Sequence, residues 1–252
     1  MAKVYTRPQS LLPVPSGFCP GCLHSMAIKL VGEVVDELGQ LDNTMHIIPV
    51  GCSTLNLLYW KGDNLGSAHG RAPAVATGFK RCCPERLVFA YQGDGDLASI
   101  GLAEIIAAAN RGENFTVIFA NNSTYGMTGG QMAPTTLIGQ KATTCKMGRD
   151  PADSGYPMKM CELLSTLEAP AFVARYALNT PKGVNEARKG IKKAFEYQMA
   201  GKGFTFVELL INCPTNWGMT PEKALEWVEE KMIPYYPLGV YKDREAEKKE
   251  AE

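Results

Sequence analysis

The sequence has no hydrophobic segment suited to crossing a bilayer, because no run of about twenty apolar residues occurs in it. Residues 1–16 also lack the continuous apolar core of an export signal. Neither sign of charge is in excess, since 26 Lys and Arg side chains balance 26 Asp and Glu side chains. Without a basic field, the chain has little electrostatic attraction for nucleic acid. We therefore expect a cytoplasmic protein that binds neither membranes nor nucleic acid.

Linkers and internal repeats are also missing. The 252 residues are therefore expected to form one domain, 1–252, with a C-terminal extension at about 219–252. Short apolar runs alternate with helical patterns, which favours an α/β fold with a doubly wound, mostly parallel sheet. The expected strands are 45–50, 87–91, 115–120, 172–177 and 204–211, and the expected helices are 23–38, 73–79, 99–111, 158–167 and 183–199.

Three segments lie outside this alternation. Residues 135–157 are polar and contain Gly, Pro and Thr, so we expect an extended loop near the functional site. Residues 227–241 carry prolines and tyrosines, and we expect an extended segment laid over another surface of this chain or of a partner. The charge run at 243–252 is expected to be a solvated terminus, with an interaction arm as the alternative.

An acidic glycine turn follows the second expected strand. Gly93 and Gly95 let the backbone approach a phosphate, and the helix that follows presents unpaired N–H groups at its N-terminus. Asp94 and Asp96 add carboxylates, and Asn122 comes directly after the next expected strand. The carboxyl ends of such strands converge, and carboxylate, amide and backbone oxygens suit octahedral magnesium. The pattern predicts a site for a magnesium diphosphate, with a surface turn and a hairpin loop as the alternative.

The spacing between this GDG and the later NN resembles the thiamine diphosphate signature. The resemblance implies that Asp94, the Asn122 side chain and the main-chain carbonyl of Thr124 hold a magnesium ion that bridges the diphosphate. The other cofactor-binding residues that it implies are Gly93, Gly95, Asp96, Gly126, Met127 and Thr128.

The eight cysteines form a second pattern, and in a reducing compartment clustered thiols indicate metal or redox chemistry more than disulfides. The CPGC turn at Cys19 and Cys22 can bring two thiolates to one metal centre. Cys213 stands in a Cys-Pro pair that resembles the end of ferredoxin cluster motifs, and Cys52 follows the first expected strand. Four sulfurs suit zinc or a 4Fe-4S cluster equally well. The other four, Cys82, Cys83, Cys145 and Cys161, are expected to be packing residues.

The segments CPGC, GCS, HGRAPAVATG, GDGD, YGMTGGQ and CPTNWG together resemble the beta subunit of 2-oxoacid:ferredoxin oxidoreductases over nearly the whole chain. The resemblance implies that the 4Fe-4S cluster next to thiamine is held by Cys19, Cys22, Cys52 and Cys213. It also implies that Ser53, Thr54 and His69 contribute to cofactor binding, with a structural role as the alternative for His69. His24 and His46 are expected to be structural.

The activity implied by this resemblance is oxidative decarboxylation of a 2-oxo acid with coenzyme A. The products are an acyl-CoA, carbon dioxide and reduced ferredoxin, so the enzyme is an oxidoreductase with an iron-sulfur protein as acceptor. The glutamate that activates thiamine lies in a pyrimidine-binding domain, for which this chain has no room. We therefore expect an alpha subunit to supply that glutamate, with gamma and delta subunits completing a hetero-oligomer.

The substrate is less well defined by the sequence. The segments CPTNWGMTPEKALEW and IPYYPLG favour the 2-oxoisovalerate or the 2-oxoglutarate branch, with 2-oxoisovalerate first. Two competing hypotheses stay open. One is a non-oxidative thiamine diphosphate-dependent decarboxylase or lyase subunit with structural zinc, and the other is a non-catalytic metal-binding scaffold whose GDGD turn binds nothing.

Overall fold

The computed structural model describes residues 6–251, with side chains described as far as residue 247. Its seven-stranded sheet has the order β2-β1-β3-β4-β6-β5-β7. Every pairing is parallel except that of β7, which lies antiparallel to β5. The predicted α/β class with a mostly parallel sheet is confirmed. The strands are β1 Thr44–Ile48, β2 Asp63–Gly66, β3 Leu87–Gly93, β4 Thr116–Asn121, β5 Phe172–Ala177, β6 Thr205–Leu210 and β7 Gly239–Asp243.

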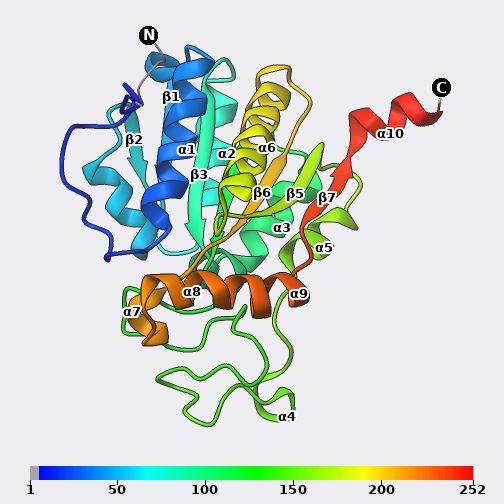
Figure 1. The fold of residues 1–252 in the computed structure, drawn as a ribbon. Helices are drawn as coiled ribbons and strands as arrows, with labels where there is room; N and C mark the ends of the chain where they lie inside the picture. The colour runs from blue at the N-terminus through cyan, green and yellow to red at the C-terminus, as the bar shows by residue number, and fades with distance from the viewer. Residues whose placement is uncertain (1–5, 252) are drawn as a thin grey trace.

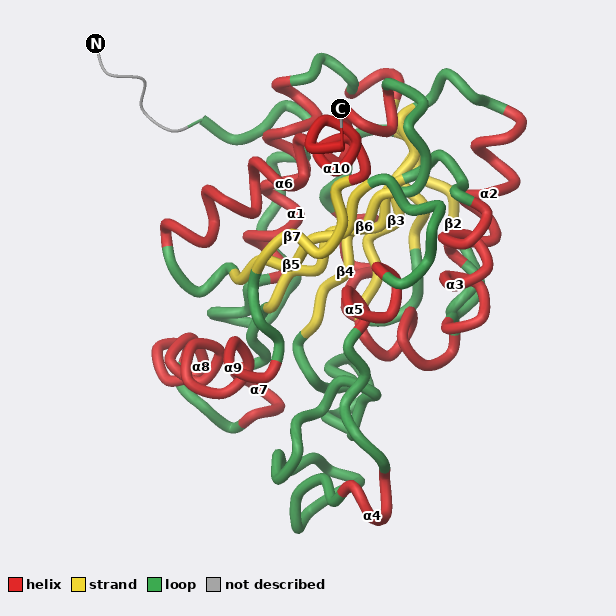
Figure 2. Tube along the Cα trace, turned by 90° about the vertical axis from the view of Figure 1, so that its right-hand side faces the viewer, coloured by secondary structure: helices red, strands yellow, loops and turns green. Residues whose placement is uncertain are grey.

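Helices cover both faces of the sheet (Figures 1 and 2). On one face α1 (His24–Glu37) and α6 (Pro181–Met199) pack on the strands in one hydrophobic cluster. On the other face α2 (Ala72–Cys82), α3 (Leu102–Arg111) and α5 (Met160–Ser165) form a second cluster. The buried residues of α1 recur at helical spacing from Ala27 to Val35, so its apolar stripe lies on the sheet. This three-layer arrangement is that of a doubly wound fold.

Two strands were missed by the sequence analysis. The edge strand β2, with the sequence DNLG, is short and largely exposed, so it has no apolar alternation to reveal it. The other edge strand, β7, has the sequence GVYKD and lies in a segment whose prolines and tyrosines suggested irregular structure. The predicted strands in the centre of the sheet are all present, because their residues are buried on both faces.

The prediction of an extended segment at 227–241 is wrong for most of its length. The chain forms α8 (Pro221–Trp227), a π-helical stretch (Val228–Met232) and α9 (Ile233–Tyr235) before it enters β7. Pro221 stands in the first turn of α8, where a missing N–H costs no hydrogen bond. Pro234 lies in α9, which continues directly from the π-helical stretch. Tyr236 is completely buried against its own chain, which supports the alternative of an intrachain cover.

The first residues of the charged segment 243–252 are bound to the rest of the protein. Asp243 ends β7, accepts a hydrogen bond from Tyr197 Oη at 2.8 Å and pairs with Lys193. Lys202 forms an ion pair with Glu245 at 2.5 Å. Arg244–Ala251 form α10. The prediction of a solvated terminus is therefore wrong for the first residues of the run, and residue 252 lies outside the described residues.

The polar segment 135–157 is a long loop with one short helix, α4 (Pro151–Ser154), as the sequence analysis predicted an extended loop here. It extends away from the sheet at the bottom of Figures 1 and 2. The Arg149 guanidinium holds this loop together by donating to carbonyl oxygens at both of its ends, including those of Pro134 at 2.9 Å and Tyr156 at 3.0 Å.

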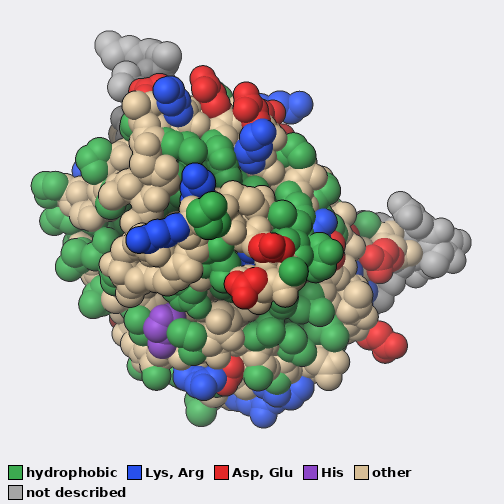
Figure 3. Space-filling view, turned by 90° about the horizontal axis from the view of Figure 1, so that it is seen from below, with side chains coloured by type: hydrophobic (Ala, Val, Ile, Leu, Met, Phe, Trp, Pro, Cys, Tyr) green, Lys and Arg blue, Asp and Glu red, His purple; other side chains and the backbone are tan. Residues whose placement is uncertain are grey.

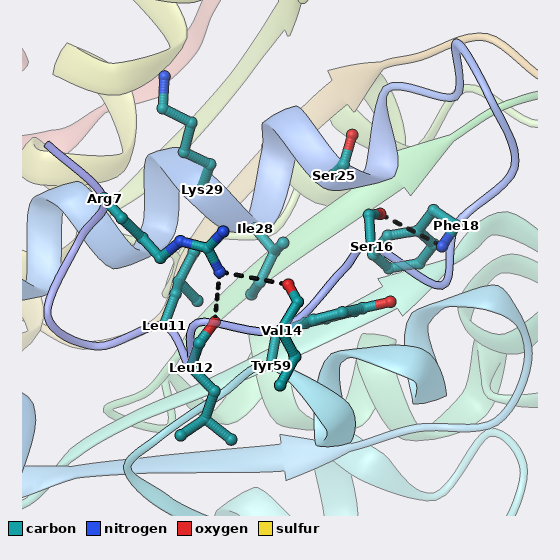
Figure 4. Close-up of a pocket in the computed structure, with 10 residues that line it drawn as sticks. All are labelled: Arg7, Leu11, Leu12, Val14, Ser16, Phe18, Ser25, Ile28, Lys29 and Tyr59. Atoms are coloured by element: carbon teal, nitrogen blue, oxygen red, sulfur yellow. Dashed lines mark hydrogen bonds between the residues drawn. The ribbon is translucent and has the colours of Figure 1, made fainter. Parts of the chain in front are cut away.

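At the other end of the chain, residues 6–18 run along α1 toward the first CPGC cysteine. Arg7 Nη1 donates to the carbonyl oxygens of Leu12 at 2.6 Å and Val14 at 3.2 Å, which closes this segment on itself (Figure 4). A hollow between the segment and α1 is lined by apolar side chains that include Ile28 and Tyr59. It contains none of the residues that the motifs single out.

The order of the strands places a switch point between β1 and β3. The chain leaves β1 toward β2 on one side, then returns past β1 to form β3 on the other. Connections that leave the carboxyl ends of β1 and β3 in opposite directions create a crevice, which is where ligands bind in open α/β sheets. The GDGD turn follows β3 at this edge, and Gly51 follows β1.

Candidate functional site

A pocket opens at this switch point, between the carboxyl ends of β1, β3 and β4. It is lined by thirteen residues from the motif segments, Gly51, Cys52, Ser53, His69, Gly93, Asp94, Gly95, Asp96, Asn122, Tyr125, Gly126, Met127 and Thr128, together with His24, Val50 and Thr124. The predicted cofactor residues thus come together, with one exception. Thr54 does not line the pocket, and its hydroxyl donates to the Pro49 carbonyl oxygen at 2.8 Å.

Asp94 lies on the wall of the pocket with 2 % of its surface exposed. Its carboxylate accepts hydrogen bonds from Thr135 Oγ1 at 2.5 Å and from the Gly95 N–H at 2.8 Å. Burial nonetheless raises the pKa of Asp94 to about 7, because these hydrogen bonds only partly replace lost hydration. A cation at this position would stabilise the ionised form. Asn122 and Thr124, the other predicted magnesium ligands, line the same pocket.

Asp96 has a different environment from Asp94. It accepts hydrogen bonds from Gln92 Nε2 at 2.6 Å and the Gly70 N–H at 2.8 Å, and its Oδ1 lies 2.5 Å from His69 Nδ1. The Val50 N–H adds a longer contact of 3.4 Å. Asp96 therefore joins the loop after β1, the turn at His69 and the GDGD turn. Its contacts are those of a residue that shapes the pocket, and they place the His69 ring at its wall.

Gly95 is required by the close approach of Tyr125. A Cβ atom at residue 95 would lie 2.0 Å from Tyr125 Cε1, so the tyrosine side chain would have to move out of its place. Tyr125 is one of the lining residues that the sequence analysis missed, although it directly precedes the predicted Gly126. Beyond Gly95 the chain enters a π-helical turn, Asp96–Ile100, and then α3. Such turns are rare and are frequent at functional sites.

The four motif cysteines line one smaller cavity next to this pocket. They come from the CPGC turn before α1, the loop after β1 and the loop after β6, and they are Cys19, Cys22, Cys52 and Cys213. Burial is the main cause that raises the pKa of Cys22 to about 12 and that of Cys52 to about 11, and the neighbouring thiols raise both further. Such thiols stay protonated in water, whereas a bound metal centre would deprotonate them. In the described part of the chain, no three His, Cys, Asp or Glu side chains are grouped closely enough to hold a single metal ion.

Two asparagines around Cys213 organise the cysteine cavity. Asn212 Oδ1 accepts from the Leu23 N–H at 3.0 Å and its Nδ2 donates to the Gly21 carbonyl at 3.1 Å, so the end of β6 holds the CPGC turn. Asn216 Nδ2 lies 3.3 Å from Cys213 Sγ and donates to the Gly126 carbonyl at 2.9 Å. Neither asparagine was among the predicted site residues, although both lie close to the cysteine within INCPTNWG.

The two cavities share a wall. His24, Cys52, Asn122 and Gly126 line both of them. A Cβ atom at residue 126 would lie only 3.1 Å from Cys52 Sγ, so glycine allows the cofactor loop to approach the thiol closely. The His24 ring is buried, stacks on Phe18 with a centroid distance of 5.2 Å, and its Nδ1 lies 2.7 Å from Tyr91 Oη. Burial lowers the pKa of His24 to about 4, so the ring is neutral near pH 7.

The remaining predictions have mixed outcomes. His46 is buried and stacks on Phe89 at 4.5 Å, which confirms its structural role. Cys161 is completely buried in the core, as expected for a packing residue. Cys82 is exposed, so the packing prediction is wrong for it, and Cys83 and Cys145 are partly exposed. Among the described residues, no helix combines the length and apolar character needed to span a membrane.

Comparisons with known proteins identify the family of this domain. Residues 49–209 match the family model described as thiamine pyrophosphate enzyme, C-terminal TPP binding domain. The chain is 50% identical over 244 residues to the ketoisovalerate oxidoreductase subunit VorA of Methanothermobacter thermautotrophicus, covering 97% of this chain and 51% of that protein. It is 36% identical over 227 residues to the 2-oxoglutarate synthase subunit KorB of Methanocaldococcus jannaschii, covering 87% and 79%. The chain thus spans about half the length of the VorA relative.

A solved structure also matches the fold. It is a 2-oxoglutarate:ferredoxin oxidoreductase from Magnetococcus marinus with 2-oxoglutarate, coenzyme A and succinyl-CoA bound, with a TM-score of 0.75 and 25% identity, covering 94% of this chain and 85% of that chain. Fold, pocket and family model define a thiamine pyrophosphate-binding enzyme domain. Within that class, the chain belongs to the beta subunits of the 2-oxoacid:ferredoxin oxidoreductases.

Proposed function

We propose that this chain binds thiamine diphosphate, magnesium and a 4Fe-4S cluster, and that with partner subunits it oxidatively decarboxylates a 2-oxo acid. The reaction would consume coenzyme A and yield an acyl-CoA, carbon dioxide and reduced ferredoxin. The observation that carries the proposal is the wall shared by the pocket around Asp94 and the cavity of the four cysteines. When bound, thiamine diphosphate supplies carbanion chemistry at a carbonyl carbon, and an iron-sulfur cluster accepts electrons singly.

The residues around Asp94 fit a magnesium diphosphate. Asp94, Asn122 and the Thr124 carbonyl would hold magnesium, since they offer hard oxygens within one pocket. Gly93 and Gly95 have no side chains that would keep a phosphate from the backbone. Ser53 Oγ is buried there without a hydrogen-bond partner in the described structure, so a ligand group could satisfy it.

The residues around the cysteine cavity fit an iron-sulfur centre. Cys19, Cys22, Cys52 and Cys213 would bind it as thiolates. Bound iron would reverse the raised pKa of these buried thiols, since a metal stabilises the thiolate. Asn216 would hold the loop of Cys213 against Gly126, because its amide contacts both. Electrons would therefore have a short path from the cofactor pocket to the cluster.

The surface around the opening of the pocket supports the proposal that this chain binds partner subunits. Seen from below, at the carboxyl edge of the sheet, many hydrophobic side chains are exposed on this face, with a few charged side chains between them (Figure 3). Large apolar side chains that are well exposed in the described structure include Leu57 and Leu58 beside the cysteine loop and Met127 in the pocket wall. Exposed apolar patches mark interaction sites. An alpha subunit would cover this face and supply the activating glutamate, and gamma and delta subunits would complete the assembly.

The proposed substrate is 2-oxoisovalerate, with 2-oxoglutarate second. Identity supports this order, because it is 50% to a ketoisovalerate oxidoreductase subunit and 36% to a 2-oxoglutarate synthase subunit. The test is reduction of ferredoxin by the anaerobically purified assembly with coenzyme A and each 2-oxo acid in turn. We expect kcat/KM for 2-oxoisovalerate to exceed that for 2-oxoglutarate by at least about tenfold, the discrimination that an apolar pocket achieves. A higher value for 2-oxoglutarate would reverse the substrate assignment, and no reduction with any 2-oxo acid would overturn the function.

A further inference from the structure

A buried arginine lies behind the proposed magnesium site without lining it. Arg175, on β5, is completely buried and pairs through Nε with Glu208 on β6 at 2.8 Å. Its two terminal nitrogens donate to both oxygens of Glu162, at 3.0 and 2.6 Å. The guanidinium also lies over the rings of Tyr236 and Tyr241, at 5.2 and 4.9 Å from their centroids. Neither the motifs nor the pocket account for this arrangement.

One chain of contacts runs from Arg175 to the asparagine turn. The second oxygen of Glu208 accepts a hydrogen bond from Asn121 Nδ2 at 2.8 Å. Asn121 Oδ1 in turn accepts from the Ser123 N–H at 3.1 Å. Ser123 has a φ of +51°, the only non-glycine residue with positive φ in the described structure. Because this conformation is unfavourable for serine, the turn needs such support, and it carries Asn122 and Thr124.

A second chain of contacts runs from Arg175 to Asp94. The Tyr236 ring packs on the guanidinium, and its hydroxyl donates to the Thr135 carbonyl at 2.7 Å. The Thr135 hydroxyl then donates to Asp94 Oδ2 at 2.5 Å. Tyr236 and Thr135 are completely buried, so water does not compete for these bonds. Both routes therefore end on residues that the proposed function assigns to magnesium.

We propose that Arg175, Glu208 and Tyr236 are positioning residues that hold the two halves of the magnesium site in register. This inference rests on the proposed function, since it assumes that Asp94 and Asn122 bind magnesium. Partners that hydrogen-bond to metal ligands fix the orientation of those ligands, and their loss typically weakens metal binding by about 10- to 100-fold. The C-terminal segment thereby contributes to the affinity of a site from which it is far removed in sequence.

Tyr236→Phe tests the route to Asp94, and Tyr241→Phe is its matched control. Both tyrosines contact Arg175, but Tyr241 Oη accepts from Arg175 Nη1 at 2.5 Å and donates to the Pro237 carbonyl at 2.6 Å. No contact in the described structure links Tyr241 to Asp94. We expect Tyr236→Phe to raise the magnesium concentration needed for half-maximal thiamine diphosphate binding by about tenfold, with Tyr241→Phe near the wild-type value. The binding would be measured by calorimetry on the purified assembly, with the Tm of each variant recorded beside it.

Glu208→Gln tests the route to the asparagine turn independently. Both oxygens of Glu208 accept hydrogen bonds, one from Arg175 and one from Asn121, and an amide offers only one acceptor. Glutamine must therefore leave one donor unpaired or force Asn121 to turn its amide away from Ser123. The control is Glu162→Gln, which also removes a carboxylate from Arg175 but has no contact with Asn121 in the described structure.

A specific signature separates positioning from general destabilisation. If the inference holds, excess magnesium restores full thiamine diphosphate binding to Tyr236→Phe and Glu208→Gln. Across the four variants, the weakening of magnesium-dependent binding then does not correlate with the decrease in Tm. Equal magnesium requirements for Tyr236→Phe and Tyr241→Phe would overturn the inference. A weakening of magnesium-dependent binding that correlates with Tm alone would overturn it as well. Wild-type assembly that binds thiamine diphosphate without magnesium would instead overturn the proposed function itself.

Discussion

Replacement of Asp94 by alanine is expected to remove magnesium-dependent retention of thiamine diphosphate. The carboxylate is the only charged oxygen among the three proposed magnesium ligands, and it is buried at the pocket wall. Loss of a residue that merely supports a ligand weakens metal binding by about 10- to 100-fold, so loss of the ligand should cost at least the upper value. Thiamine diphosphate would be quantified after purification and dialysis. An unchanged content in Asp94→Ala would refute the assignment.

Asp94→Asn provides the matched control, because it keeps the shape of the side chain and removes its charge. Its amide can still accept from the Gly95 N–H, and its NH2 group can donate to the Thr135 hydroxyl, which now accepts. It should lose magnesium as Asp94→Ala does, yet it should stabilise the cofactor-free protein above pH 7. The folded pKa of about 7 lies above the ordinary value of 3.8, so the protonated form is favoured in the fold. The contribution of protonated Asp94 to the free energy of unfolding is complete below the pKa of the unfolded state, and it is lost as the pH rises through the pKa of the folded state.

The size of this effect follows from the shift in pKa. A difference of about three pKa units corresponds to about 4 kcal/mol, lost as the pH rises from about 4 to 7. The wild-type protein without cofactor should therefore lose stability over this range relative to Asp94→Asn. Thermal unfolding between pH 4 and pH 8 measures the difference, and parallel curves for the two proteins would contradict a buried, ionising Asp94.

Cys213→Ser is expected to remove iron and acid-labile sulfide while leaving thiamine diphosphate bound. A serine hydroxyl is a poorer ligand than a thiolate for iron, and the cavity supplies one thiol from each of four positions. The pocket around Asp94 does not include Cys213, so the proposed thiamine diphosphate ligands are unaffected. Ferredoxin reduction with any 2-oxo acid should be lost in consequence, because electrons have no first acceptor.

The control for this variant is Cys145→Ser, which changes a thiol in the loop outside the cysteine cavity. It should keep iron, sulfide and activity at wild-type levels. A cluster that survives Cys213→Ser would show that the ligand set is wrong. Equal loss of iron from Cys213→Ser and Cys145→Ser would mean that iron is not bound specifically in the cysteine cavity.

The parts of the site that the sequence predicted are those in which neighbouring residues act together. The turn at Asp94 follows a buried strand and shares a signature spacing with Asn122, so local sequence placed both at one edge of the sheet. The cysteines were recognisable from their motif segments, and the structure brings them to one cavity. Burial of each central strand on both faces made those strands apparent as apolar runs.

The parts that the sequence could not predict depend on contacts between distant segments. Tyr236 contacts Thr135 across a separation of 101 residues, and Asn212 holds the CPGC turn across a separation of 191 residues. Nothing in the sequence near Tyr236 indicates its partner. The prolines of the segment around Tyr236 favoured an extended conformation, whereas most of that segment is helical. The conformation of such a segment is decided by its packing, since the secondary-structure propensities of its residues are weak compared with tertiary contacts.

We propose that one chain holds thiamine diphosphate and an iron-sulfur cluster across a shared wall. The most direct test is anaerobic purification of the assembly, with iron, zinc, acid-labile sulfide and thiamine diphosphate quantified in the same sample. We expect iron and sulfide in the ratio of a 4Fe-4S cluster, thiamine diphosphate in equal amount to this chain, and co-purifying subunits. Zinc without sulfide, or no thiamine diphosphate, would show that the chain does not hold both groups.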